Sequence, residues 1–171
     1  MHVPTHILSG WVVGNVLPLT PRERLFCMIA ASVPDLDGLG IVFGDAFYQR
    51  WHHVACHGLP FGLLVSIPLA LLALRPWPTR IGLVLVFLFC FHLHLLMDYY
   101  GSGPGWPIAY FWPLSDFKFV NWSAWELSSW QNQLAAGALL LVTVLIAWRR
   151  RRTPLEVLMP SLDAKLTRRP I

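Results

Sequence analysis

Charged residues are scarce in this sequence. Only 13% of its 171 residues are Asp, Glu, Lys or Arg, against about 25% in an average soluble domain. Hydrophobic residues make up 56%, and the mean hydropathy is +0.53. This balance argues against an ordinary soluble domain and predicts an integral membrane protein.

Cysteine is equally sparse, and the three present form no CxxC pair. A disulfide framework is therefore not expected. Cys27 and Cys90 lie in apolar runs and are predicted to be small core residues. Cys56 stands beside His57, within reach of a bound metal. The N-terminus, MHVPTHILSG, lacks the basic segment that opens a cleavable signal peptide, so we expect none.

The basic residues gather near the end of the chain. Residues 149–152 are four arginines, and Lys165, Arg168 and Arg169 follow. No aromatic residues are interleaved with them and no known reading module is present, so we expect no nucleic-acid partner. The run is typical of a segment that faces lipid headgroups on the cytoplasmic side. Residues 153–171 are predicted to be a loosely ordered, basic cytoplasmic tail.

The sequence contains several long hydrophobic runs. A membrane span needs about 20 residues. Pro34, Asp35 and Asp37 interrupt one run, which predicts a broken helix that lines a cavity inside the protein. We therefore predict an all-α helical membrane bundle over residues 1–152, with about five hydrophobic helical segments, some short or broken. These segments are 7–19, 25–43, 59–74, 81–98 and 131–148.

Arginines alternate between the connections. Residues 22–24, residues 75–80 and the block at 149–152 are basic, and the intervening connections are poor in Lys and Arg. The positive-inside rule then places these basic segments and the C-terminus in the cytoplasm. The N-terminus, residues 44–58 and residues 99–130 face the other side. All seven histidines fall toward that outer side, together with three aspartates.

Residues 99–130 are rich in Trp, Tyr and Phe. Such side chains favour the headgroup level of a bilayer. We predict that this segment lies on the membrane surface above the histidine cluster, either as an anchor or as part of a groove for a membrane lipid.

The histidine spacing suggests a metal site. His94 and Asp98 are four residues apart, on one face of a helix, whereas His92 is offset by about 200° and is predicted to pack elsewhere. In HHVACH, His53 and His57 are also four apart. His52 would need a turn to join them, so the choice between His52 and His53 stays open.

The segment PDLDG adds two carboxylates. If the residues after Pro34 are extended, Asp35 and Asp37 point the same way, and His6 lies in the opening THILSG. Histidine nitrogens combined with aspartate oxygens suit zinc, with manganese or iron as alternatives. A polar network between helices and a bis-histidine haem site are the rival interpretations.

The order of these motifs resembles a known family. T-H, P-D-L-D, a paired-histidine element and H-x-x-x-D, followed by glycines and W-P, run from Thr5 to Pro113. This order resembles that of the membrane-bound, metal-dependent hydrolases, the YdjM-like, LexA-binding, inner-membrane-associated family. The usual family pairing, H-R-G-x-T-H-S, matches this chain at His52 and His57 and departs from it at the arginine, threonine and serine. More distantly, the set is similar to that of zinc-dependent phospholipase C and the zinc single-strand nucleases.

The resemblance implies an inner-membrane hydrolase of phosphoester bonds, with a lipid or membrane-proximal substrate. Two or three divalent ions would be held on the extracytoplasmic side. Asp37 would be either a bridging ligand or the general base. A non-enzymatic protein with a structural metal remains an alternative; so does an ion transporter, although one-sided clustering argues against it. The implied metal ligands are His6, Asp35, Asp37, His52 or His53, His57, His94 and Asp98.

Overall fold

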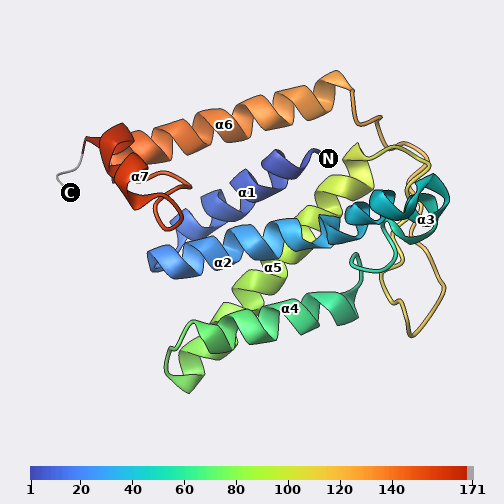
Figure 1. The fold of residues 1–171 in the computed structure, drawn as a ribbon, viewed down its shortest axis with the longest axis horizontal. Helices are drawn as coiled ribbons and strands as arrows, with labels where there is room; N and C mark the ends of the chain where they lie inside the picture. The colour runs from blue at the N-terminus through green and yellow to red at the C-terminus, as the bar shows by residue number, and fades with distance from the viewer. Residues whose placement is uncertain (169–171) are drawn as a thin grey trace.

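Helices make up the fold of the described part of the chain, residues 1–168 of a computed structural model (Figure 1). Within these residues the backbone forms no strand, and only one isolated bridge joins Ile108 and Phe119. The predicted all-α class is confirmed. Arg169, which we expected in the basic tail, lies outside the described residues. The helices are α1 (Val3–Val16), α2 (Pro21–Ser32), the 3₁₀ helix η1 (Val33–Phe43), α3 (Asp45–Trp51), α4 (Leu59–Leu72), α5 (Trp77–Gly101), α6 (Trp130–Arg150) and α7 (Pro160–Thr167).

Within residues 1–168, three helical segments are long and apolar enough to cross a membrane. They are α2 continued by η1 (Pro21–Phe43), α5 and α6. The helix α4 is apolar but has only 14 residues. The five predicted apolar stretches each overlap a helix, but the count of about five membrane segments stays a prediction.

The predicted interruption near Pro34 is present as a change of helix type: the α-helix ends at Ser32, and a 3₁₀ helix begins at Val33. The chain continues from α2 into η1 as one 23-residue segment. Proline has no N–H, so it cannot donate the bond that would continue the α-helix, and the backbone tightens into 3₁₀ turns instead. The segment therefore changes from α to 3₁₀ geometry next to Pro34 but stays helical.

A core of small and aromatic residues packs α2, α4 and α5 together. Its buried members include Phe26, Leu69 and Phe87, and Cys27 and Cys90 lie among them as predicted. The helix α1 approaches α2 closely at Gly10, where an added Cβ would come within 2.4 Å of the Cys27 carbonyl oxygen. Small residues allow such close helix packing in membranes. Gly10 lies one turn after His6, so this contact fixes the position of His6 relative to α2.

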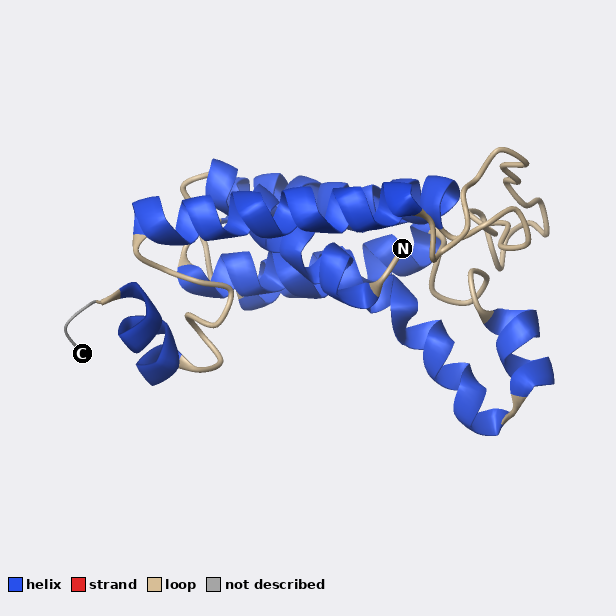
Figure 2. Cartoon of the chain, turned by 90° about the horizontal axis from the view of Figure 1, so that it is seen from above, coloured by secondary structure: helices blue, strands red, loops and turns tan. Residues whose placement is uncertain are grey.

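The basic connections meet at one end of the bundle. Arg75 pairs with Glu23 at 2.6 Å, and Arg24 pairs with Glu156 at 2.6 Å. Glu156 belongs to the predicted loose tail, which proves ordered through residue 168 and contains α7. The C-terminal segment and the loop-rich region lie at opposite ends of the helices (Figure 2).

The other end gathers the start of α1, the end of α5, η1 and the long connection between α5 and α6. Asn132 of α6 ties this connection down, because its Nδ2 donates to the carbonyl oxygens of Gly101, Glu126 and Leu127. Its Oδ1 accepts a hydrogen bond from Trp125 Nε1 at 2.7 Å. Asn132 is 1% exposed, so one buried amide holds the aromatic connection over the end of the bundle.

Candidate metal centre

Histidines and aspartates from four separate elements meet at this end. His6 comes from α1, Asp35 from η1, His53 and His57 from the turn after α3, and the pair His94 and Asp98 from α5. All except Asp35 are buried. The clustering that the arginine pattern predicted is therefore present in the fold.

The first group of ligand atoms comprises His6, Asp35, His94 and Asp98, which lie within 4.8 Å of one another. His6 Nε2 is 3.2 Å from Asp98 Oδ1, and His94 Nε2 is 3.8 Å from Asp35 Oδ1. The rings of His6 and His94 stack with their centroids 3.8 Å apart. This group offers two nitrogens and two carboxylates, a donor set that suits zinc.

The second group comprises His53, His57 and Asp98. Asp98 Oδ2 is 3.6 Å from His53 Nε2 and 3.4 Å from His57 Nε2. It is also 2.9 Å from His94 Nε2. Asp98 therefore belongs to both groups, with Oδ1 toward His6 and Oδ2 toward the other three imidazoles.

In three of these imidazoles, the contact that Nδ1 makes on the side away from Asp98 determines which ring nitrogen carries the hydrogen. The Nδ1 atoms of His53 and His94 lie 3.2 and 2.7 Å from the carbonyl oxygens of Trp106 and Ala31. His57 Nδ1 lies 2.9 Å from Asp37 Oδ2. Carbonyl and carboxylate oxygens only accept, so each Nδ1 must donate.

Each neutral imidazole therefore presents an unprotonated Nε2. These lone pairs converge on the Asp98 carboxylate, and the Nε2 atoms of His57 and His94 face each other at 3.3 Å. Lone pairs and a carboxylate repel one another unless a proton or a metal cation lies between them. This is also how metal-binding histidines are commonly oriented, with the outer nitrogen held by an oxygen acceptor.

The unpaired polar atoms of His6 and Asp35 show whether a metal would fit this site. Both ring nitrogens of His6 and the Oδ2 atom of Asp35 are buried without a hydrogen-bond partner among the described residues. The 3.2 Å contact between His6 and Asp98 is close enough for an ion pair but lacks hydrogen-bond geometry. Buried polar atoms are rarely left unpaired, and a divalent cation would satisfy Asp35 Oδ2 and one ring nitrogen of His6.

The sequence matches the family of YdjM inner membrane proteins over residues 1–162. The chain belongs to that family. No curated protein and no solved structure matches it. The family assignment agrees with the predicted resemblance and with an inner-membrane location.

In this YdjM family member Asp37 lies outside both groups. Its Oδ1 is 2.7 Å from His52 Nδ1, and its Oδ2 accepts from His57 Nδ1 and from the Cys56 amide. Asp35 and Asp37 do not point the same way, because η1 is a 3₁₀ helix and not extended. At three residues per turn, positions two apart diverge by about 120°. Asp37 is thus placed to orient His57. Both of its oxygens already accept hydrogen bonds, so neither is free for the predicted role of bridging ligand or general base.

The conformation of the turn at residues 52–58 determines whether His52 or His53 faces the candidate metal centre. His53 has a left-handed backbone with φ 63°, which aims its ring at Asp98. His52 bonds to Asp37 and stacks on Tyr48 with ring centroids 4.7 Å apart. His53 is therefore the one that joins the group, as the spacing favoured. The spacing argument assumed a helix, however, whereas the segment is a turn.

Protonation in this turn follows the same contacts. Burial would lower the pKa of His57, but hydrogen bonds with Asp37 and Asp98 outweigh it and raise the pKa to about 9. Burial, reinforced by repulsion from His57, holds the pKa of His53 well below its usual value. Burial and the Asp37 charge raise the pKa of the Cys56 thiol to about 11, and its sulfur belongs to neither group. The Cys56 side chain therefore stays a thiol.

His92 lies apart from the centre, as its helical offset predicted. Its Nδ1 is 2.7 Å from the Leu88 carbonyl oxygen, and its Nε2 is 2.8 Å from the Tyr110 hydroxyl. Both ring nitrogens are satisfied within the protein. His92 is a packing residue of the α5 face that lies away from His94.

A cavity of about 160 Å³ opens on the centre beside Asp35, His53 and Asp98. No motif in the sequence marks Tyr48, Ser102 or Glu126 as site residues, and only the aromatic composition of residues 99–130 marks Trp106. The Met1 amino group contacts Asp98 and Ser102 at the edge of this cavity. The full lining is Met1, Asp35, Tyr48, His52, His53, Asp98, Ser102, Trp106, Glu126 and Leu127.

Proposed function

We propose that the protein is a membrane-embedded, metal-dependent hydrolase that cleaves phosphoester bonds in a lipid or another substrate near the membrane surface. The observation that supports this proposal is Asp98, whose two oxygens face two overlapping groups of ligand atoms. A carboxylate shared in this way is the arrangement that holds two metal ions close together in binuclear hydrolytic sites.

The ligand set favours zinc over calcium or magnesium, because histidine nitrogens predominate and hard cations prefer oxygen alone. Manganese and iron accept the same donors. His6, Asp35, His94 and Asp98 would hold one ion, and His53, His57 and Asp98 the other. Divalent ions there would neutralise phosphoryl oxygens and activate a water molecule.

The protein's own groups would position the substrate. The cavity beside the centre, about 160 Å³, is smaller than the roughly 300–1,000 Å³ of pockets that enclose drug-sized ligands. It suits a phosphoryl head group, and any acyl chains would stay outside. Burial raises the pKa of Tyr48, so its phenol stays protonated and can donate to a phosphate oxygen. Asp37 acts through His57, which it holds in place.

The centre is proposed to face the extracytoplasmic side. The basic connections contact each other at the opposite end of the bundle through Arg75, Glu23, Arg24 and Glu156. The positive-inside rule places that end in the cytoplasm. Reporters fused after Arg152 and within residues 112–120 should give a cytoplasmic and an extracytoplasmic signal, respectively; the reverse pair would invert the topology.

A structural metal is the second candidate, because ions at these groups would join α1, η1, the 52–58 turn and α5. Protein purified without chelator should be analysed for metal content and then assayed on a panel of phospholipids and soluble phosphodiesters. We expect bound zinc and turnover that is lost in Asp98→Asn. Bound metal with no hydrolysis of any phosphoester, together with unfolding on chelation, would favour the structural role.

A further inference from the structure

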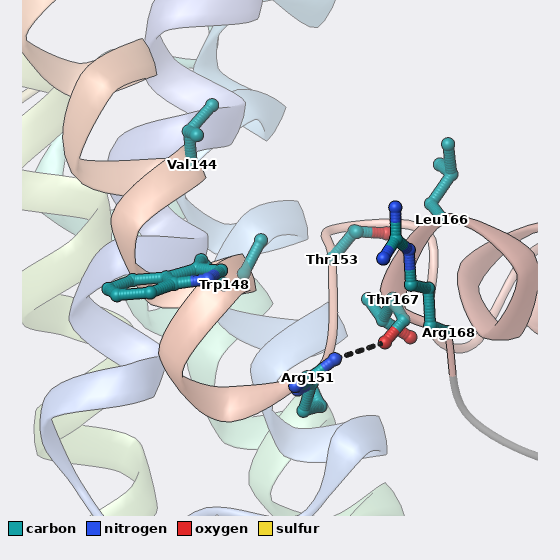
Figure 3. Close-up of a pocket in the computed structure, with 8 residues that line it drawn as sticks. Val144, Trp148, Arg151, Thr153, Leu166, Thr167 and Arg168 are labelled. Atoms are coloured by element: carbon teal, nitrogen blue, oxygen red, sulfur yellow. Dashed lines mark hydrogen bonds between the residues drawn. The ribbon is translucent and has the colours of Figure 1, made fainter.

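A second cavity lies at the opposite end of the molecule from the metal centre. It measures about 460 Å³ and sits where α6 ends and the chain returns through α7 (Figure 3). None of its residues takes part in the metal centre. The lining is Val144, Ala147, Trp148, Arg151, Thr153, Leu166, Thr167 and Arg168.

Two arginines give this cavity its charge. Arg151 Nη1 donates to the carbonyl oxygen of Thr167 at 3.3 Å, an uncharged acceptor that does not offset the guanidinium charge (Figure 3). Among residues 1–168, no carboxylate pairs with Arg151 or Arg168. The two nearest carboxylates in sequence are engaged elsewhere, Glu156 with Arg24 and Asp163 with the Thr153 amide. Two like charges line one cavity, so this cavity attracts an anion.

The backbone at both arginines is unusual. Arg151 caps α6 and Arg168 caps α7, with φ of 54° and 53°. A helix often ends in this left-handed conformation, but glycine is the residue that normally adopts it. A cation near a helix C-terminus is favourable by itself. That effect does not explain why the caps of two different helices line the same cavity.

The remaining lining is apolar on one side and polar on the other. Val144, Ala147 and Trp148 belong to α6, which is long and apolar enough to span a membrane, and they precede its basic end. Trp148 is 69% exposed, and tryptophan favours the headgroup level of a bilayer. The Thr153 oxygen accepts from the Leu155 amide, so its hydroxyl hydrogen is free to be donated. The apolar wall of the cavity, from α6, and its cationic wall, from the arginines, thus meet at the headgroup level of the bilayer, where a phospholipid has its phosphate.

We propose that this cavity binds the phosphate of an anionic phospholipid. Arg151, Arg168 and the Thr153 hydroxyl contact the phosphate oxygens, and the first carbons of an acyl chain lie along Val144 and Trp148. An anionic lipid fits better than a zwitterionic one, because a choline group would bring a positive charge toward arginines 149–152. This site is independent of the proposed hydrolase activity.

The test uses the full-length protein in detergent, titrated with phosphatidylglycerol or phosphatidylcholine and followed by native mass spectrometry. We expect phosphatidylglycerol to be retained preferentially. The double variant Arg151→Gln/Arg168→Gln should weaken its binding by about tenfold or more, because each charged hydrogen bond contributes about 1.5–3 kcal/mol, and tenfold is 1.4 kcal/mol. The matched control Arg149→Gln/Arg150→Gln removes the same charge outside the cavity and should retain the lipid.

Equal weakening in both double variants would overturn the proposal, because it would show general attraction to a basic surface. Equal retention of the two lipids would also overturn it. Inorganic phosphate that displaces the lipid at millimolar concentration would identify a free-phosphate site instead. If the glutamine pair fails to fold, Arg151→Lys/Arg168→Lys keeps the charge but loses the planar fork. That pair should still weaken binding several-fold, and undiminished binding would reject the assignment.

Discussion

Asp37 is the residue at which a positioning role can be separated most clearly from a catalytic one. It accepts from His52 Nδ1 at 2.7 Å, from His57 Nδ1 at 2.9 Å and from the Cys56 amide at 3.2 Å. Asparagine at this position keeps the shape but has one accepting oxygen. If that oxygen turns to His57 and the Cys56 amide, the NH₂ group faces His52.

The expected change in zinc affinity depends on which histidine loses its hydrogen-bond acceptor. Removing the outer partner of a metal-binding histidine typically lowers metal affinity or activity about 10- to 100-fold. In Asp37→Asn, His57 keeps its acceptor, while His52, outside both groups and 13% exposed at its side chain, can change tautomer. We therefore expect a loss of about tenfold in zinc affinity, or roughly 1.4 kcal/mol. Asp37→Ala removes the hydrogen-bond acceptor of both histidines, so the loss of zinc affinity should approach about 100-fold.

Zinc affinity would be measured by competition with a chelator of known strength, on protein whose melting temperature is recorded in parallel. Asp45→Asn is the matched control, because Asp45 is an exposed carboxylate in the first turn of α3. It should bind zinc like the wild type. Unchanged zinc affinity with abolished turnover in Asp37→Asn would refute the positioning role and restore Asp37 as general base. Unchanged affinity and turnover would remove Asp37 from the site altogether.

Three further predictions concern the shared centre. Asp98→Asn should lose both metal ions, whereas Asp35→Asn should lose at most one; elemental analysis showing equal loss would contradict the two-group arrangement. His92→Ala should keep the full metal content, because its partners are Leu88 and Tyr110, and metal loss as in His94→Ala would contradict the assignment by helix face. In the metal-free protein His57 holds a proton up to a pKa of about 9. Metal must displace this proton, so zinc affinity should fall by about tenfold for each unit that the pH drops below 9. Calorimetry in buffers of different ionisation heat should detect the released proton, and a pH-independent affinity would exclude His57 as a ligand.

Much of the metal centre could be predicted from the sequence. The alternation of arginines placed the histidines at one end, and the i, i+4 spacing of His94 and Asp98 put both on the buried face of α5. These inferences worked because α5 is a regular helix, in which spacing translates directly into direction. The same reasoning correctly set His92 apart.

The prediction failed where the backbone is irregular. Nothing in PDLDG distinguishes an extended turn from a 3₁₀ helix, yet that choice decides whether Asp37 meets the metal groups or His57. The left-handed conformation of His53 is equally invisible, because it depends on the contacts of the turn with Asp98 and Trp106. The carbonyl oxygens of Ala31 and Trp106 belong to the backbone, so no residue type marks them as partners.

The charge balance of the centre argues for cations more strongly than its composition does. Asp35, Asp37 and Asp98 bring three carboxylates to one buried end of the bundle. Every ion-pair partner they have among the described residues is a histidine or the Met1 amino group, never Lys or Arg. A network that served only to pack helices would need fixed positive charges there, because buried unpaired carboxylates are strongly unfavourable. Among the described residues the Met1 amino group beside Asp98 is the one such charge, and the other partners are imidazoles. Such imidazoles neutralise the carboxylates only by taking up protons, as His57 does, or by sharing divalent ions with them.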